Sequence, residues 1–206
     1  LKICPLIKQF GAAVVVGCID EDPKQGMAVT KERKLAIAKR SFDLLTQKYH
    51  IPAHDIIFDA LVFPCGTGDK DYIGSAKETI LGIKLIKEHF PQTYTILGIS
   101  NVSFGLVQNA REVMNTVFLH ENLQAGLDFA IVNSEKLERI THIPQQEIDL
   151  CKNLLFANSG SFDDALEQLT TYFRAKDKTK TKTIKKATSV EEDRKSTRLN
   201  SSHLVI

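Results

Sequence analysis

The chain has 206 residues, 43% of them hydrophobic and 25% charged, which is ordinary for a globular protein with one sizeable core. Its formal net charge is +2, but residues 174–198 carry ten Lys or Arg against four Asp or Glu, so the body is mildly acidic. That balance argues against nucleic acid as the ligand of the fold. No apolar run approaches the roughly 20 residues of a membrane span and no signal peptide is visible, so we expect a cytoplasmic protein without a membrane partner.

Four apolar segments, each followed by a polar residue, predict four parallel strands, and the continuous apolar run of the first is typical of a strand buried on both faces. The segments and their polar residues are Gly11–Ile19 with Asp20, Ile56–Phe58 with Asp59, Tyr94–Ile99 with Asn101, and Leu127–Val132 with Asn133. In a parallel α/β protein, ligands bind at the carboxyl ends of the strands. We therefore expect these four polar side chains to lie along one rim.

Amphipathic helices separate the strands. Thr30 is the expected N-cap of the first helix, Pro52 and Pro91 follow the first and second, and Gly126 ends the third. Their apolar stripes, at steps of three and four, are Leu35, Ala38, Phe42, Leu45 and Tyr49, then Ile73, Ala76, Ile80, Ile83, Ile86 and Phe90, then Val113 and Val117. Four such strand–helix units with right-handed crossovers fit half of an eight-unit TIM barrel, although a small open sheet fits the same periodicity.

The sequence beyond the fourth unit changes character. Residues 143–174 are wholly helical in pattern, with apolar faces at Ile148, Cys151 and Leu155 and at Phe162, Leu166, Leu169 and Phe173. Residues 175–194 are Lys/Thr-rich and lack apolar surface to offset their ordering entropy, so we expect a disordered basic linker from about Ala175. Residues 195–206 resemble a translated sequencing adapter, and we expect them to be non-native. The chain begins at Leu1 without Met, and we expect that start to lie within a domain.

The cysteines and one glycine-rich loop have plain interpretations. Cys4, Cys18, Cys65 and Cys151 form no CxxC pair and the His residues lack ligand spacing, so we expect reduced, packed thiols and no protein-bound metal. The loop 64–69 contains GTGD but lacks the GK[ST] ending of a P-loop and the third Gly of a dinucleotide fingerprint. We expect it to be a flexible rim loop.

Each rim residue has a functional and a structural interpretation. A carboxylate at Asp59, embedded in apolar sequence, is costly unless it is hydrogen-bonded, which favours a binding role over a cap or an ion pair. Asn101 can donate and accept together, but Asn also caps turns. Asp20 fits a solvated acidic loop, and Asn133 fits a helix cap. Arg111 stands near a helix start, where the dipole favours anions, so an anionic group such as a ligand carboxylate is expected beside it.

Longer segments resemble the pterin-binding (methyltetrahydrofolate) domain of the cobalamin-dependent methionine synthase family over about residues 1–140. The segments are IIFDALVFPCGTGDKDYIGSAKETILGIKLIK, TILGISNVSFGL, AREVMNTVFL and AGLDFAIVNSEKLE. The resemblance implies that residues 1–142 are strands five to eight of a partial pterin-binding barrel. It also implies that residues 143–174 lead to the cobalamin-binding cap.

The resemblance further implies a methyltransferase that moves the N5 methyl of methyltetrahydrofolate to cob(I)alamin, for homocysteine methylation to methionine. The family's hydrogen-bond donor at N5 falls on Asn101, which is then the catalytic residue. The acceptor for the pterin N–H groups falls on Asp59, and a folate-binding Arg falls on Arg111. The implied partners are methyltetrahydrofolate and the cobalamin-binding domain of the same full-length chain. Cobalamin, and the zinc of the homocysteine module, would be bound by modules absent from this chain.

Some departures from the family pattern are visible. Ala60 stands where the family usually has Pro, which we expect to loosen that turn, and the GLVQN loop lacks a second Arg that some members carry. The remaining pterin ligands of the family would lie upstream of Leu1. Three alternatives stay open: a stand-alone methyltetrahydrofolate–corrinoid methyltransferase, an inert fragment or non-catalytic binding module, and an unrelated parallel α/β enzyme. The helical extension favours the multidomain enzyme.

Overall fold

The structure is a computed structural model that describes residues 3–24 and 26–184. These residues form a parallel sheet in the order β1–β2–β3–β4, so the strands lie side by side in their sequence order. The strands are β1 (Val14–Gly17), β2 (Ile56–Asp59), β3 (Tyr94–Gly98) and β4 (Phe129–Ile131). The predicted α/β fold with four parallel strands is confirmed, and it is consistent with part of a TIM barrel.

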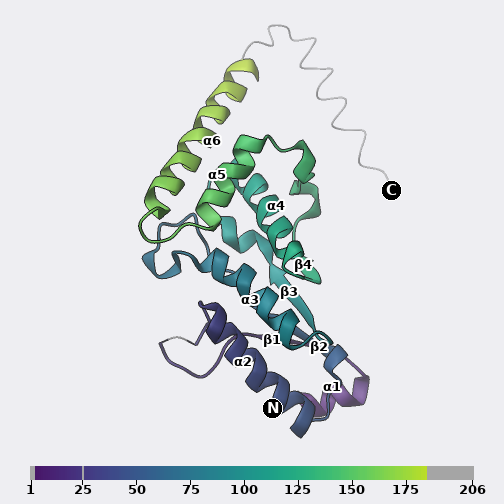
Figure 1. The fold of residues 1–206 in the computed structure, drawn as a ribbon. Coiled ribbons are helices and arrows are strands. Elements are labelled where there is room, and N and C mark those ends of the chain that lie inside the picture. Colours follow the sequence, from purple (N-terminus) through teal and green to yellow (C-terminus); the bar gives the residue numbers. More distant parts are fainter. Residues whose placement is uncertain (1–2, 25, 185–206) are drawn as a thin grey trace, which may run out of the picture.

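Helices alternate with the strands and then continue beyond them. They are α1 (Cys4–Phe10), α2 (Lys31–Asp43), α3 (Ser75–His89), α4 (Gln108–Gln124), α5 (Gln145–Leu155) and α6 (Phe162–Ile184). Strands that follow one another in order through right-handed crossovers place every crossover helix on the same face of the sheet. Figure 1 shows this arrangement, with α2, α3 and α4 side by side against one face of the sheet.

Local sequence explains how α2 begins. The Thr30 hydroxyl accepts a hydrogen bond from the Arg33 N–H at 3.4 Å, which confirms the predicted N-cap. The Glu78 carboxylate, on α3, accepts the Lys31 N–H at 2.7 Å and places a negative charge at the positive end of α2. The two helices are therefore joined at their amino-terminal ends as well as along their length.

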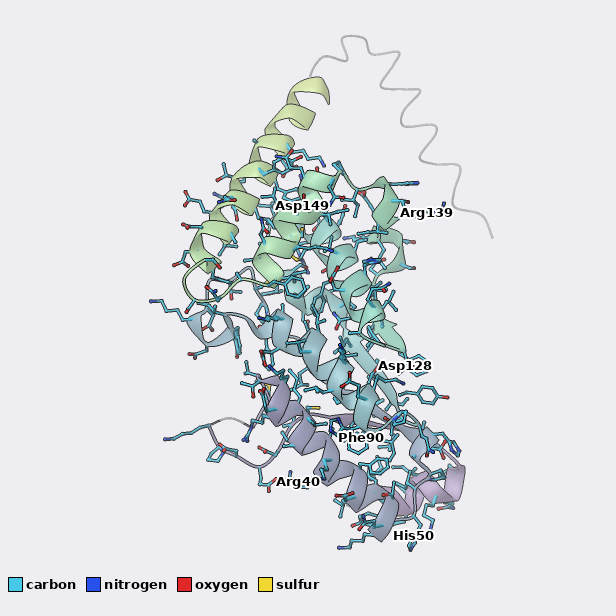
Figure 2. The ribbon with its side chains drawn as sticks, in the orientation of Figure 1. Arg40, His50, Phe90, Asp128, Arg139 and Asp149 are labelled. Atoms are coloured by element: carbon cyan, nitrogen blue, oxygen red, sulfur yellow. The ribbon has the colours of Figure 1, made fainter. Side chains whose placement is uncertain are left out.

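The core lies between the helices and the face of the sheet that they cover. Phe58 of β2 packs against Phe90, whose ring also stacks on Phe42 of α2 with centroids 4.6 Å apart. Figure 2 shows Phe90 beside α2. Ile56 and Leu97 are fully buried on the same face. Each such aliphatic or aromatic side chain contributes about 1.5–3 kcal/mol of transfer free energy, so this layer holds the sheet and helices together.

The opposite face of the sheet is open, which corrects the prediction that the first strand is buried on both faces. Val15 of β1 is 56% exposed, and on β4 Phe129 is 45% and Ile131 65% exposed. The strand order explains this exposure. It places all the crossover helices on one face, so no helix of the described chain covers the other face. In a closed barrel this face would be the interior, where layers of side chains from all eight strands pack.

The carboxyl-terminal helices pack on α4 rather than on the sheet. The predicted apolar faces are confirmed, since Cys151 and Leu155 of α5 and Phe162, Leu169 and Phe173 of α6 are buried. Glu147 of α5 is also buried, and its carboxylate accepts the Tyr172 hydroxyl at 3.1 Å and pairs with the Lys176 ammonium of α6. These contacts join α5 and α6 into one helical unit.

The structure differs from the predicted linker over residues 175–184, which continue α6 as helix as far as Ile184. The side chains of Lys176 and Asp177 are held by Glu147 of α5 and Asn109 of α4, and Lys is a favourable helix residue. The rest of the predicted linker and the adapter-like segment lie outside the described residues. Within residues 3–24 and 26–184, no helix has the length and apolar character needed to cross a membrane.

The open face and the edge strands β1 and β4 determine how the isolated chain should behave. Uncovered apolar surface and unpaired strand edges promote association with other chains. We expect the purified 206-residue chain to aggregate or to stay molten in size-exclusion chromatography and thermal melting. A longer protein that supplies the other strands of a barrel is the control and should melt cooperatively. A sharp, monomeric, two-state melt of the isolated chain would contradict the half-barrel architecture.

Candidate functional site

Asp59 lies at the carboxyl end of β2, in the middle of the sheet. It is opposite Gly17 of β1 and Ile96 of β3, and it alternates with the fully buried Phe58. Because neighbouring residues of a strand point to opposite faces, the half-buried Asp59 belongs to the open face. A carboxylate is therefore placed at the rim, on the side of the sheet that the helices leave uncovered.

The carboxylate of Asp59 has an internal partner for one of its two oxygens. Its Oδ1 accepts the Leu61 N–H at 2.9 Å, and this is the one hydrogen-bond donor that the described residues offer it. Burial raises the pKa of Asp59, whereas the Leu61 hydrogen bond and the Lys34 charge act to lower it. Asp59 Oδ2 is thus an acceptor available to a ligand with N–H groups.

Asn101 comes to the same face from the next strand. It belongs to the short 3₁₀ turn η4 (Ile99–Ser103) that follows β3, and it is exposed. A Cβ atom at Gly98 would stand 3.5 Å from the Asn101 Nδ2, so the amide lies over Gly98. Since Gly98 and Ile96 share the open face with Asp59, the structure brings the Asp59 and Asn101 side chains to neighbouring places on one rim.

Arg111 is tied to the turn that carries Asn101. Its Nε donates to the Ser103 hydroxyl at 3.2 Å, and that hydroxyl donates to the Ser100 carbonyl at 3.2 Å. Arg111 also lines a cavity of about 190 Å³ together with Ser100, Asn133 and Lys136, among other residues. The lining carries two cationic side chains, Arg111 and Lys136, against one carboxylate, Glu112, and this excess of positive charge suits an anionic group.

The two remaining rim residues have structural contacts: Asn133 is a cap, as its alternative interpretation had it, whereas Asp20 is paired with Arg33 and only 13% exposed, which corrects the expectation of a solvated acidic loop. The Asp20 carboxylate accepts two hydrogen bonds from Arg33 Nη2, at 2.8 and 3.0 Å. The Asn133 side chain accepts the Glu135 N–H at 3.1 Å and so caps a short turn, although it also faces the cavity beside Arg111. Asp20 is thus paired with Arg33 of α2, and Asn133 groups with Arg111.

The sequence pattern did not indicate Lys34, which is the most unusual residue near the site. It is fully buried on α2, and its ammonium donates to the Ala60 carbonyl at 2.6 Å, the Ala28 carbonyl at 2.8 Å and the Leu61 carbonyl at 3.4 Å. Burial lowers its pKa to about 8, against the opposing effect of neighbouring acidic groups. A Lys among polar residues normally indicates an exposed side chain. The one sequence signal for the burial of Lys34 is Gly82 on α3, because a side chain at that position would occupy the space that Lys34 fills.

The contacts of Lys34 correct the expectation that Ala60 loosens the turn after Asp59. Ala60 is fully buried, and its carbonyl is held by the Lys34 ammonium. Leu61 follows with φ of +63°, a left-handed conformation that is uncommon for a residue with a side chain. The turn is therefore fixed by hydrogen bonds where a Pro would have fixed it by its ring.

The GTGD loop is anchored at its start, whereas residues 67–69 are exposed, so flexibility stays a prediction for that part of the loop. Cys65 is buried, and its N–H and thiol both donate to the Val102 carbonyl, at 2.9 and 3.1 Å. A Cβ atom at Gly105, where φ is +92°, would stand 2.8 Å from the Gly66 carbonyl oxygen. The loop after β2 therefore packs backbone to backbone against the loop that carries Asn101.

Comparison with known proteins identifies a family and two relatives of this chain. A family model described as a pterin-binding enzyme matches residues 1–133, which include all four strands. Methionine synthase of Mycobacterium leprae (strain TN) is 37% identical over 174 residues, covering 84% of this chain and 14% of that protein. Methionine synthase of Mycobacterium tuberculosis (strain ATCC 25618 / H37Rv) is 37% identical over 172 residues, with the same two coverages. The chain thus spans a small part of the length of these curated relatives.

The contact between the two rim loops gives a testable pair of variants. Gly105→Ala combines left-handed strain with a backbone clash, whereas Gly68→Ala meets strain alone, since no atom lies within 4 Å of its Cβ position. We expect Gly105→Ala to speed amide exchange at Cys65 about tenfold, in a longer protein that supplies the rest of the barrel. Gly68→Ala is the matched control and should leave that exchange unchanged. Equal exchange in both variants would show that the two loops move independently.

Proposed function

The chain belongs to the family of pterin-binding enzymes, and from this premise we propose that it is half of the methyltetrahydrofolate-binding barrel of a larger, methionine-synthase-type methyltransferase. The observation that carries the proposal is the Asp59 carboxylate on the open face of the sheet, with Oδ2 left for a ligand and the Asn101 amide on the neighbouring strand. An acceptor and a donor in adjacent places are what a ring with N–H groups and a reacting amine requires.

Asp59 is the proposed acceptor for the N–H donors of the pterin ring. A hydrogen bond to a charged group is stronger than one between neutral groups, so an ionised carboxylate binds such donors best. The Leu61 N–H and the Lys34 charge oppose the effect of burial and favour that ionised form. Binding should therefore weaken as the pH falls through the raised pKa of Asp59, because the protonated carboxyl can accept fewer hydrogen bonds.

Asn101 is the proposed catalytic residue. The methyl group must leave N5 of methyltetrahydrofolate, and an unprotonated amine is a very poor leaving group. A hydrogen-bond donor beside N5 stabilises the charge that develops as the methyl departs. Cobalamin, bound elsewhere in the larger protein, supplies the nucleophile. The Asn101 amide donates to N5, and its place over Gly98 holds it on the same face as Asp59.

Arg111 and its cavity are proposed to bind the anionic part of the folate. Lys136 adds a second cationic side chain to the lining, and the Arg111–Ser103 hydrogen bond couples this pocket to the turn that carries Asn101. Substrate binding at Arg111 would thus be linked to the position of the catalytic amide. Asn133, on the same cavity, is proposed to contribute a weaker polar contact.

The extent of the similarity favours a multidomain enzyme. The alignment with the mycobacterial methionine synthase is 174 residues long, whereas the family model ends at residue 133, so the likeness continues into α5 and α6. A stand-alone methyltetrahydrofolate–corrinoid methyltransferase needs only the barrel. We therefore propose that the cobalamin-binding partner is a domain of the same longer chain, reached through these helices.

Asn101→Ala tests the catalytic role in that longer protein. If the amide donates to N5 most strongly as the methyl leaves, the variant should lose rate much more than folate affinity. Loss of one preorganised donor costs roughly 3 kcal/mol, or about a hundredfold in rate. The measurement is single-turnover methyl transfer to cob(I)alamin at saturating folate, with the exposed Asn153→Ala on α5 as control. An unchanged rate would leave Asn101 as a turn residue only.

Asp59→Asn tests the binding role separately. The amide keeps the shape of the side chain but replaces an ionised acceptor by a neutral group, so pterin affinity should fall about tenfold to a hundredfold. The measurement is the dissociation constant of 5-methyltetrahydrofolate. Asp149→Asn, a carboxylate on α5 (Figure 2), is the control and should bind normally. Normal affinity of Asp59→Asn would remove Asp59 from the pterin site.

A further inference from the structure

The buried ammonium of Lys34 lies beneath the turn that follows Asp59. Two of the carbonyls that it binds, those of Ala60 and Leu61, are the first two after Asp59 in the chain. The third, that of Ala28, belongs to the loop after β1. One side chain of α2 therefore joins the loops that follow two neighbouring strands, directly behind the rim.

The turn that Lys34 holds is strained and needs such support. Leu61 has φ of +63°, which a residue with a side chain adopts only where its surroundings impose it. Its N–H is bound by Asp59 Oδ1 and its carbonyl by the Thr79 hydroxyl at 2.9 Å, in addition to Lys34. The orientation of the Asp59 carboxylate thus depends on the same turn that Lys34 fixes.

The buried Lys34 side chain requires a glycine in the neighbouring helix α3, which is unfavourable for that helix. Gly82 lies in the interior of α3, where Gly is unfavourable, and a Cβ atom there would stand 2.7 Å from Lys34 Cδ. The Phe63 ring adds a favourable contact, with its centroid 5.2 Å from the ammonium. An apolar side chain would fill the same space but would leave the Ala28 and Ala60 carbonyls without this donor.

We propose that Lys34 is a positioning residue for pterin binding: its ammonium fixes the turn at Ala60 and Leu61, and so holds the Asp59 carboxylate in a defined orientation. The inference rests on the proposed function of Asp59. In this proposal Lys34 does not contact the pterin. It affects pterin binding through the turn that it holds and through its charge.

The charge of Lys34 separates this role from a purely structural one. The titratable groups around it are Cys18 at the end of β1, Asp59 on β2 and Glu78 on α3. The Cys18 thiol, with its pKa raised to about 12 by burial, is neutral near neutral pH, and the Glu78 carboxylate binds the Lys31 N–H. Below about pH 8, Lys34 is charged and lowers the pKa of Asp59. Removing that charge should therefore raise the pKa of Asp59.

Lys34→Met, made in the longer protein, tests the proposal. Met retains most of the length of the side chain and removes the donor and the charge. The dissociation constant of 5-methyltetrahydrofolate should rise about tenfold to a hundredfold, since a misplaced carboxylate binds poorly. In addition, affinity should begin to fall at a higher pH than in the wild type as the solution is acidified, because Asp59 is protonated more readily.

Lys87→Met is the matched control. The Lys87 ammonium likewise binds a carbonyl, that of Thr93, and it pairs with Asp128, far from Asp59 at the amino ends of β3 and β4. Figure 2 marks Asp128 there. This variant should leave both the folate dissociation constant and its pH dependence unchanged.

Each outcome decides the proposal. Wild-type affinity and pH dependence in Lys34→Met would overturn it, and so would an equal loss in Lys87→Met, which would indicate general destabilisation. A wild-type protein that binds no methyltetrahydrofolate would instead refute the proposed function.

Should Lys34→Met fail to fold, Gly82→Ala is a second variant, which displaces the Lys34 side chain but keeps its amine. Gly82→Ala should also weaken folate binding. Unaltered binding in Gly82→Ala would then contradict the role of Lys34.

Discussion

The order of the strands is the constraint on which the rest of this structure depends. Four parallel strands joined in sequence by right-handed crossovers place α2, α3 and α4 on one face and every strand's carboxyl end on one rim. The covered face becomes the core, built around Phe58, Phe90 and Leu97. The other face stays open and carries Asp59 at its rim, at the carboxyl end of β2. The separation of a packed side from an open side thus follows from topology alone.

A carboxylate at such a place must be kept in a defined orientation, and the structure does this with backbone groups. Asp59 Oδ1 binds the Leu61 N–H, and the Leu61 and Ala60 carbonyls bind Lys34. On the neighbouring strand, Gly105 packs on Gly66, so the loop that carries Asn101 rests on the loop that follows Asp59. Catalytic geometry in the proposed methyltransferase would therefore depend on contacts between loops as much as on the strands themselves.

The features that could be predicted from sequence were those that repeat along the chain or match a local motif. The four strands, the Thr30 cap and the apolar faces of α5 and α6 follow from hydrophobic periodicity and capping chemistry, and Asp59 and Asn101 follow from strand ends. The contacts that could not be predicted join residues distant in sequence. Lys34 and Ala60 are 26 residues apart, and Cys65 and Val102 are 37 apart. The extent of α6 was also missed, because its Lys/Thr composition does not reveal the partners that Glu147 and Asn109 provide.

A crystal structure of the longer protein with 5-methyltetrahydrofolate bound would test the proposed site most directly. The pterin should lie on the open face, with its N–H groups about 2.7–3.2 Å from Asp59 and the Asn101 amide at a similar distance from N5. Leu61 should keep its left-handed backbone above the Lys34 ammonium. A pterin bound away from β2 and β3, with Asp59 paired to another protein group, would contradict the proposed site.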